Sequence, residues 1–451
     1  MAGRTIAPRD SRFAAAVFYD PATTPRAGDD AVNHQISASS NRHDLDARLD
    51  RLAEVAVRVG LGLRHGQELV MTAPIEALPL ARRITEQAYR AGASLVTTLF
   101  NDDAATLARF RHAPDEAFDR APGWLFGGMA AAFGEGAARL AISGDDPALL
   151  AAQDPDRVSR ANKARSRAYL PALQRIVSFD INWTIVPFAA PAWARAMFPD
   201  APEAEAVTRL WDAIGAATRA DDPDPVEAWR AHNAALHART RYLNDRRFSA
   251  LHFRGPGTDL RVGLADDHAW MGGAEAAKNG VTCNPNIPTE EVFTTPHAAR
   301  VDGHVRSTKP LSYSGTLIQD IAVHFENGRI VEADARTGAE VLRKVLDTDE
   351  GARRLGEVAL VPHSSPISRS GLLFFNTLFD ENAASHIALG QAYKTCFRNG
   401  GAGLSDEDFR ARGANESLIH IDWMIGSGEI DLDGIDADGA AVPLMRRGEW
   451  A

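Results

Sequence analysis

The sequence predicts an α/β N-terminal domain followed by a β-rich α+β C-terminal domain. Up to about residue 248, strand-like apolar runs alternate with helical stretches, which is the pattern of a parallel α/β unit. Beyond that point, short strand-like runs separated by turns replace the alternation. A chain of 451 residues is long enough for two or three domains of ~100–200 residues each. We therefore predict an N-terminal extension at residues 1–44, an α/β domain at 45–248 and a second domain at 249–451.

The predicted extension has the composition of a loosely packed arm. It contains Pro8, Pro21 and Pro25 and a polar stretch at residues 33–42. Helical spacing begins at Leu45 and continues through a series of apolar residues: Leu49, Leu52, Val55 and Val59. The regular part of the chain is therefore expected to begin with a helix.

Four strand-like runs define the predicted α/β domain. They lie at residues 68–72, 94–100, 140–143 and 180–186. The first two flank a helical stretch at 75–91, and Gly92 is placed to end that helix. A further stretch, 201–246, is strongly helical in composition. Strands joined by helices in this order favour a parallel sheet.

The second domain is predicted from strands and turns. Residues 251–264 contain strand-like runs around a Gly-Pro-Gly turn, and 320–325 is a strand candidate followed by a turn at Gly328. Residues 358–361 and 418–425 are also strand-like. Residues 382–393 are expected to form a helix.

The overall charge argues against nucleic acid or an anionic membrane as a partner. The formal net charge is 49 − 60 = −11. The cysteines, Cys283 and Cys396, are too few for a disulfide framework, and no CxxC zinc pattern occurs. The sequence has no apolar run of ~18 residues, and the short run at 13–19 lacks a cleavage site for a signal peptide. A cytoplasmic protein is therefore expected.

The last third of the chain holds five potential metal ligands: Glu291, Glu357, His386, His420 and Asp422. His420 and Asp422 are two residues apart in a predicted strand, so both should project from the same side. By the same rule Glu290 and Glu291 should face opposite sides, and at most one of them is expected to bind a metal. Glu357 is expected at the start of its strand, where a strand end can present it to a site.

His386 and Tyr393 are seven residues apart in the predicted helix and should share a face. A tyrosine hydroxyl beside the metals would donate a hydrogen bond to a developing oxyanion. Each residue alone also suits a structural role, since a Glu-Glu pair often lies on a solvated strand edge and a tyrosine is often half-buried packing. Together, three carboxylates and two imidazoles suit one or two divalent ions such as zinc, cobalt or manganese. Two such ions favour a metallohydrolase.

Several long segments, in this order, carry a resemblance to a known family. They are Asn286-Ile-Pro-Thr-Glu-Glu-Val-Phe-Thr294, Leu346-Asp-Thr-Asp-Glu-Gly351, Leu355-Gly-Glu-Val-Ala-Leu-Val-Pro362, Asn376-Thr-Leu-Phe-Asp-Glu-Asn-Ala-Ala-Ser-His-Ile-Ala-Leu-Gly390 and Arg447-Gly-Glu-Trp450. From about Leu45 to its end, the chain resembles the aminopeptidase T and aminopeptidase S family of dimetal exopeptidases. The extension before residue 45 departs from the typical family pattern.

The resemblance implies a set of site residues. The family's ligands, two glutamates, two histidines and an aspartate, fall at Glu291, Glu357, His386, His420 and Asp422. The family's active-site tyrosine falls at Tyr393, and members form homodimers with enclosed active sites. We therefore predict an aminopeptidase with two divalent ions, acting on peptides with a free N-terminus. Glu290 or a ligating glutamate would be the general base, and Glu290 would alternatively meet the substrate amine.

Two alternative functions belong to other classes of protein. Two histidines and one carboxylate also form the facial triad of mononuclear non-haem iron enzymes, so a ring-opening dioxygenase on a hydroxypyridine-like substrate is the main rival. The number of ligands separates the two, since five favour two metals and three favour one iron. A non-catalytic protein with a structural metal is disfavoured, because structural zinc sites are usually rich in cysteine.

Overall fold

The computed structural model describes residues 44–313, 316–401 and 403–451. The predicted extension, except for Asp44, lies outside these residues. Arg48–Ala451 forms one compact unit. The predicted mixed α/β content is confirmed, while the domain boundary near residue 248 stays a prediction. No helix in the described part of the chain is long and apolar enough to cross a membrane.

The first sheet is parallel and has four strands in the order β2-β1-β3-β4. Its strands are β1 (Glu68–Pro74), β2 (Leu95–Asn101), β3 (Ala138–Ser143) and β4 (Trp183–Pro187). All four coincide with predicted runs, although each begins or ends a few residues from the prediction. The parallel arrangement follows from the helices that connect the strands.

Helices precede, connect and follow these strands. Residues 44–55 are helical and continue into a π-helical turn, η1 (Ala56–Leu61). The others in this half are α2 (Leu78–Arg90), α3 (Asp103–His112), α4 (Gly123–Gly134), α5 (Pro155–Val177), α6 (Pro191–Met197), α7 (Glu203–Thr218) and α8 (Pro225–Arg246). Short 3-10 helices occur at η2 (Ile75–Ala77) and η3 (Asp115–Asp119). The helix predicted at 75–91 is therefore η2 followed by α2, and Gly92 beyond it has φ +93°.

The second sheet is antiparallel and has eight strands in the order β14-β13-β10-β6-β5-β18-β19-β20. Its strands are β5 (Ala250–Gly255), β6 (Thr258–Leu264), β10 (Pro296–Arg306), β13 (Ala322–Glu326), β14 (Arg329–Asp334), β18 (Asp431–Ile435), β19 (Ala441–Arg446) and β20 (Glu449–Trp450). The predicted Gly-Pro-Gly turn joins β5 to β6.

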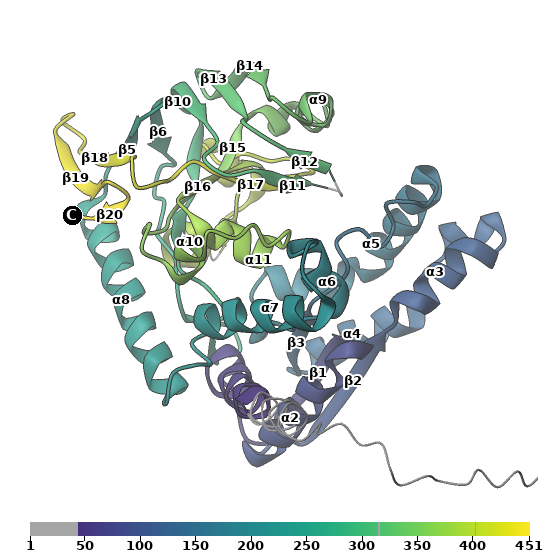
Figure 1. The fold of residues 1–451 in the computed structure, drawn as a ribbon. Helices are drawn as coiled ribbons and strands as arrows, with labels where there is room; N and C mark the ends of the chain where they lie inside the picture. The colour runs from purple at the N-terminus through teal and green to yellow at the C-terminus, as the bar shows by residue number, and fades with distance from the viewer. Residues whose placement is uncertain (1–43, 314–315, 402) are drawn as a thin grey trace, which may run out of the picture. The chain divides into compact units, whose positions relative to one another are not determined.

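The third sheet is antiparallel, with the order β17-β16-β15-β9. Its strands are β9 (Val292–Thr294), β15 (Leu355–Leu360), β16 (His386–Gly390) and β17 (His420–Met424). In Figure 1, β15 of this sheet lies beside β10 of the larger sheet, and the two strands are in contact. One hydrophobic core joins the two sheets, and it contains Val358, Ile387 and Trp423 of the third sheet together with Phe253 and Val262 of the second.

Short elements complete the structure. Two small hairpins are β7 (Glu275–Ala276) with β8 (Thr282–Cys283), and β11 (Leu311–Tyr313) with β12 (Thr316–Ile318). The remaining helices are α9 (Ala339–Leu346), η4 (Glu350–Arg353), α10 (Pro366–Ser370), α11 (Thr377–Asp380), η5 (Glu381–Ala383), η6 (Lys394–Cys396), η7 (Arg398–Gly401) and α12 (Asp406–Ala411). Cys283 and Cys396 are both buried and free.

The helix predicted at residues 382–393 is wrong. The segment begins inside η5, becomes strand β16 from His386 to Gly390, and then passes into a loop. The run Ile-Ala-Leu after His386 is short and apolar, and such a run suits a buried strand as well as a helix. The five residues of β16 are all buried, as expected for a central strand with protein on both faces.

Candidate metal centre

The register of the third sheet brings predicted ligands together on one face. Glu357 lies opposite Ala388 in β16, and Ala388 lies opposite Asp422 in β17. Residues directly opposite in an antiparallel pair point to the same side of the sheet. Glu357 and Asp422 therefore flank the methyl group of Ala388, which leaves room above the centre of the sheet.

The two histidines project from that same face. His386 is two residues before Ala388 in β16, and His420 is two residues before Asp422 in β17. His420 also lies opposite Gly390, whose φ is +102°. A Cβ at this glycine would lie 2.1 Å from the carbonyl oxygen of Ile419, so only glycine fits where the two strands are this close.

Glu291 reaches the face from the edge of the sheet. It directly precedes β9, where Phe293 lies opposite Ala359. Ala359 in turn lies opposite His386, so Phe293 is on the same face as the histidine. Glu291 is two residues before Phe293 and is therefore expected on that face as well.

A β-bulge sets the direction of Glu357. The pairing of β15 with β16 shifts between Leu355 and Glu357, so Gly356 is the extra residue. A Cβ at Gly356 would meet the carbonyl oxygen of Gln391 at 2.3 Å. Glu357 therefore lies inside β15, two residues after its start, and the prediction that it opens the strand is wrong.

The ligand atoms converge to within a few ångströms. Nε2 of His386 lies 3.2 Å from Oε2 of Glu291 and 3.5 Å from Oε1 of Glu357. Nε2 of His420 lies 3.7 Å from Oε2 of Glu357 and 3.5 Å from Oδ1 of Asp422. Atoms bound to one ion at ~2.0–2.1 Å with tetrahedral angles lie roughly 3.3 Å apart, so these separations suit ligation.

Backbone carbonyls orient both imidazole rings. Nδ1 of His386 is 3.1 Å from the carbonyl oxygen of Ala384, and Nδ1 of His420 is 2.7 Å from that of Gln391. A carbonyl only accepts hydrogen bonds, so each Nδ1 carries the proton and donates it. Each Nε2 is then left with a lone pair for a metal ion, in the tautomer that ligating histidines usually adopt.

Several of these atoms are buried without a hydrogen-bond partner. Among the described residues, Oε2 of Glu291, Nε2 of His386 and Oδ1 of Asp422 are in this state. An unsatisfied buried polar group costs about 1–3 kcal/mol, and more when it is charged. Three such atoms facing one point suit the binding of a cation. The donors of Glu291, Glu357 and His386 also form a group suitable for a metal.

The electrostatics support the same conclusion. Burial lowers the pKa of His386, but contact with the carboxylates of Glu291 and Glu357 outweighs burial and raises that pKa well above its ordinary value. Burial also lowers the pKa of His420, and the charges of Asp422 and Glu357 raise it to about 9. Without a metal, both rings would hold a proton that a divalent ion can replace.

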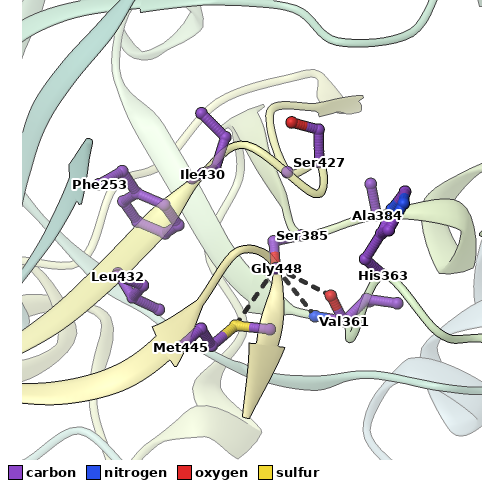
Figure 2. A pocket seen from close by; sticks show the side chains of 11 residues that line it. Phe253, Val361, His363, Ala384, Ser385, Ser427, Ile430, Leu432, Met445 and Gly448 are labelled. Carbon is purple, nitrogen blue, oxygen red and sulfur yellow. Dashed lines mark hydrogen bonds between the residues drawn. The ribbon is translucent and has the colours of Figure 1, made fainter. Parts of the chain in front are cut away.

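Ser385 fixes the chain just before His386. Its hydroxyl accepts a hydrogen bond from the amide of Val361, at 3.1 Å, and donates to the carbonyl oxygen of the same residue, at 3.2 Å. Figure 2 shows these bonds beside a small cavity of about 10 Å³ that Met445 and Gly448 also line. Because β16 starts at the next residue, these two hydrogen bonds fix the position of His386 along the strand.

Glu290 lies before β9, next to Glu291, and has a different set of contacts. Its Oε1 accepts a hydrogen bond from Nη2 of Arg219 at 2.8 Å, and its Oε2 lies 3.8 Å from Nε2 of His232. Burial raises the pKa of Glu290, and the positive charge of Arg219 lowers it by less, so the pKa is raised overall. The carboxylate of Glu290 therefore forms a buried ion pair with Arg219.

Glu381 is a residue that the sequence analysis missed. It begins η5, and its Oε1 lies 3.4 Å from Nδ2 of Asn286. Burial, followed by the negative charges of Glu291 and Asp422, raises its pKa well above the ordinary value. Glu381 also lines a small pocket together with Asp422, so it is a fourth carboxylate near the ligands. Since residues 382–393 were expected to be helical, nothing in the sequence pattern directed Glu381 towards the site.

Tyr393 lies beside the histidine of β17, although not for the predicted reason. Its ring centroid is 4.7 Å from that of His420, and the residue is 37% exposed. Burial of the hydroxyl, with the charges of Glu357 and Asp422, raises its pKa. The phenol therefore stays protonated and can donate a hydrogen bond. The two-turn helical spacing from His386 is wrong, because a strand and a loop connect the two residues.

The fold and this site define a metal-dependent hydrolase. The profile of the thermophilic metalloprotease family (M29) matches residues 45–450. The chain belongs to this family.

Named relatives cover nearly the whole described chain. Aminopeptidase T of Thermus thermophilus is 60% identical over 402 residues, which are 89% of this chain and 98% of that protein. Aminopeptidase 2 of Geobacillus stearothermophilus is 47% identical over 406 residues, or 90% of this chain and 98% of that protein. The solved structure of wild-type AmpT from Thermus thermophilus superposes with a TM-score of 0.84 at 59% identity, and covers 90% of this chain and 99% of its own.

Proposed function

We propose that this metal-dependent aminopeptidase uses two divalent ions, held by Glu291, Glu357, His386, His420 and Asp422, to remove N-terminal residues from peptides. Membership of the metalloprotease family and the high-identity relatives named aminopeptidases make the chain a metal-dependent aminopeptidase. The same membership decides against the ring-opening dioxygenase. The number of ions, their identity (zinc, cobalt or manganese) and the roles of individual residues are what we propose here.

The single observation that carries the dinuclear proposal is the position of Glu357. Its Oε1 faces His386 at 3.5 Å and its Oε2 faces His420 at 3.7 Å. A carboxylate whose two oxygens face different imidazoles suits a bridge between two ions. Glu291 and His386 would complete one half of the centre, and His420 and Asp422 the other.

The charge of the site supports two ions over one. With Glu381, four carboxylates surround the two imidazoles, all of them wholly or partly buried. Two divalent cations would balance the negative charge of these carboxylates, whereas one cation would leave part of it uncompensated in a poorly solvated place. Uncompensated buried charge is strongly unfavourable.

In the reaction, two divalent ions would supply the hydrolytic chemistry by polarising the scissile carbonyl and lowering the pKa of a water. Glu381 would accept the proton of the attacking water, since it is the carboxylate near the ligands that the proposal does not assign to an ion, and it lines a pocket together with Asp422. Tyr393 would donate a hydrogen bond to the oxyanion that develops on the carbonyl. We assign the base to Glu381 instead of Glu290, because Arg219 engages the Glu290 carboxylate.

Two further features belong to the proposal. Aminopeptidase activity requires that a free α-amine be recognised, and the carboxylates of the centre, with a bound metal ion, would provide that contact. We also propose that the chain forms a homodimer, as the resemblance to the family implies.

The Glu381→Gln variant tests the assignment of the base. Glutamine keeps the shape and the contact with Asn286 but accepts no proton. We expect kcat to fall more than about 100-fold while metal content stays that of the wild type, because loss of a general base costs ~10²–10⁴-fold. Loss of metal from this variant would make Glu381 a ligand instead, and an unchanged kcat would remove it from the reaction.

A further inference from the structure

Glu291 differs from the other proposed ligands in how its backbone is supported. The other four lie inside strands of the third sheet, where pairing with neighbouring strands fixes the backbone: Glu357, His386, His420 and Asp422. Glu291 precedes β9, and strand pairing begins only at the next residue, Val292. The position of its carboxylate therefore depends on what holds the chain just before it.

Side chains from distant segments hold the two residues that precede Glu291. Nε2 of His232, on α8, lies 2.8 Å from the carbonyl oxygen of Thr289 and donates a hydrogen bond to it, since a carbonyl only accepts. The amide of Glu290 donates to Oδ1 of Asn382 at 2.7 Å, and Asn382 is fully buried. Consecutive backbone groups ahead of the ligand are thus tied to other parts of the fold.

One guanidinium nitrogen joins these contacts into a network. Nη2 of Arg219 donates to Oε1 of Glu290 at 2.8 Å and lies 2.9 Å from Nδ1 of His232. Because Nε2 of His232 carries the proton that Thr289 accepts, Nδ1 has a lone pair for Arg219. Burial, together with the charge of Arg219, lowers the pKa of His232 to about 3, so the ring stays neutral and keeps this arrangement.

Arg219 occupies a backbone position that normally suits glycine. It ends α7 with φ +61°, in the left-handed region. Its guanidinium lies over the ring of Trp229 at 4.9 Å, and the indole of Trp229 donates to the carbonyl oxygen of Thr218 at 2.7 Å. Residues other than glycine persist in such conformations where the surroundings impose them, and they concentrate at functional sites. The contacts of the side chain account for an arginine at this helix end.

Building on the proposed function, we propose that Arg219 is a positioning residue: it holds the chain ahead of Glu291 and so sets the affinity for the ion that Glu291 and His386 would bind. Arg219 acts through the side chain of Glu290 and the imidazole of His232. The carboxylate that it positions lies 3.2 Å from Nε2 of His386. Groups that orient a metal ligand in this way typically contribute about 10–100-fold to metal affinity.

The effect of Arg219 should be confined to one half of the centre. His420 and Asp422 both belong to β17, and pairing with β16 holds their backbone. The ion in that half should therefore bind almost as tightly without Arg219. A loss of affinity restricted to one ion separates positioning of Glu291 from a general loosening of the fold, which would weaken both ions.

The Arg219→Gly variant removes the side chain while suiting the backbone. Stepwise dissociation constants for zinc, measured by competition with a chelator, should show one ion weakened about 10–100-fold and the other nearly unchanged. Arg247→Gly is the matched control, because Arg247 ends α8 with φ +53° but has an exposed side chain, 3.7 Å from Asp267. Both of its zinc constants should equal those of the wild type.

Two further backgrounds identify the half that Arg219 serves. In a chain that already carries Glu291→Gln, adding Arg219→Gly should change the zinc affinity very little, because the ligand that Arg219 positions is gone. In a chain that carries Asp422→Asn, the same addition should weaken zinc binding by the full factor. The difference between the two backgrounds measures the coupling between Arg219 and Glu291.

Equal losses in the two backgrounds, or no loss in either, overturn the positioning role. Circular dichroism of the metal-free variants reports whether the fold is kept. If Arg219→Gly does not fold, Arg219→Lys decides by the same comparison, because lysine keeps the charge but lacks the planar fork. A wild-type chain that binds a single zinc ion would instead overturn the proposed dinuclear centre, whereas two ions weakened equally overturn only the role of Arg219.

Discussion

The Oε1 atom of Glu357 lies 3.5 Å from Nε2 of His386. Its second oxygen faces the other imidazole of the centre at 3.7 Å. The bulge at Gly356 makes this possible, because it shifts the pairing of β15 by one residue and places Glu357 opposite Ala388. Glu357 is therefore the residue on which both halves of the proposed centre depend.

Replacing Glu357 by glutamine should remove most metal and activity while the fold is kept. We expect kcat/KM to fall by more than about 100-fold, since loss of a group that merely supports a ligand already costs 10–100-fold. Metal analysis and circular dichroism of the purified variant measure the two effects. The control is Glu350→Gln, an exposed residue paired with Arg329. Wild-type metal content and rate would show that Glu357 is no ligand.

Removing the Tyr393 hydroxyl should slow the reaction without weakening substrate binding. In Tyr393→Phe the ring contact with His420 is kept, and only the proposed donor to the oxyanion is lost. We expect kcat to fall about 10²–10³-fold with KM nearly constant. Tyr242→Phe, an exposed tyrosine on α8, is the control. A rise in KM at constant kcat would instead assign Tyr393 to binding.

Metal affinity should increase with pH up to about 9. The metal-free His420 has a pKa of about 9, because Asp422 and Glu357 outweigh the effect of burial, and its proton must leave before the ring can bind an ion. Below that pKa, each displaced proton makes the affinity about tenfold higher per pH unit. Competition with a chelator between pH 6.5 and 9.5 measures the slope. An affinity that stops rising near pH 6.5, the ordinary value for histidine, would contradict the raised pKa.

A free α-amine should be required for hydrolysis. Acetylation removes the amine's charge and its lone pair, and with them the contact to the acidic centre. Leu-Ala should therefore be cleaved while N-acetyl-Leu-Ala is left nearly untouched under the same conditions. Equal rates for the two peptides would indicate an endopeptidase or amidase.

The parallel strands and the His420–Asp422 pair could be predicted because their periodicity is local. Alternation of polar and apolar residues in β17 fixes which side chains share a face. The location of His386 in a strand could not be predicted in the same way, because Ile-Ala-Leu is buried on both faces and has no alternation. Pairing with β15 and β17, which are distant in the sequence, determines that this segment forms a strand.

The bulge and the fourth carboxylate depend on contacts that are distant in sequence. Gly356 is required by the carbonyl oxygen of Gln391, which the local pattern does not reveal. Glu381 approaches the ligands through the turn that Asp380 holds, and Asn286 contacts it from 95 residues away. The contact of Glu290 with Arg219 could not be predicted, since Arg219 lies 71 residues earlier in the chain.

The number of metal ions per chain tests the central claim most directly. The protein is loaded with zinc, cobalt or manganese, freed of excess ion, and measured by elemental analysis alongside its Glu357→Gln variant. Two equivalents per chain in the wild type, with a large loss in the variant, are predicted by the geometry of Glu357 between His386 and His420. A single equivalent at saturation, bound equally well without the Glu357 carboxylate, would contradict the dinuclear centre.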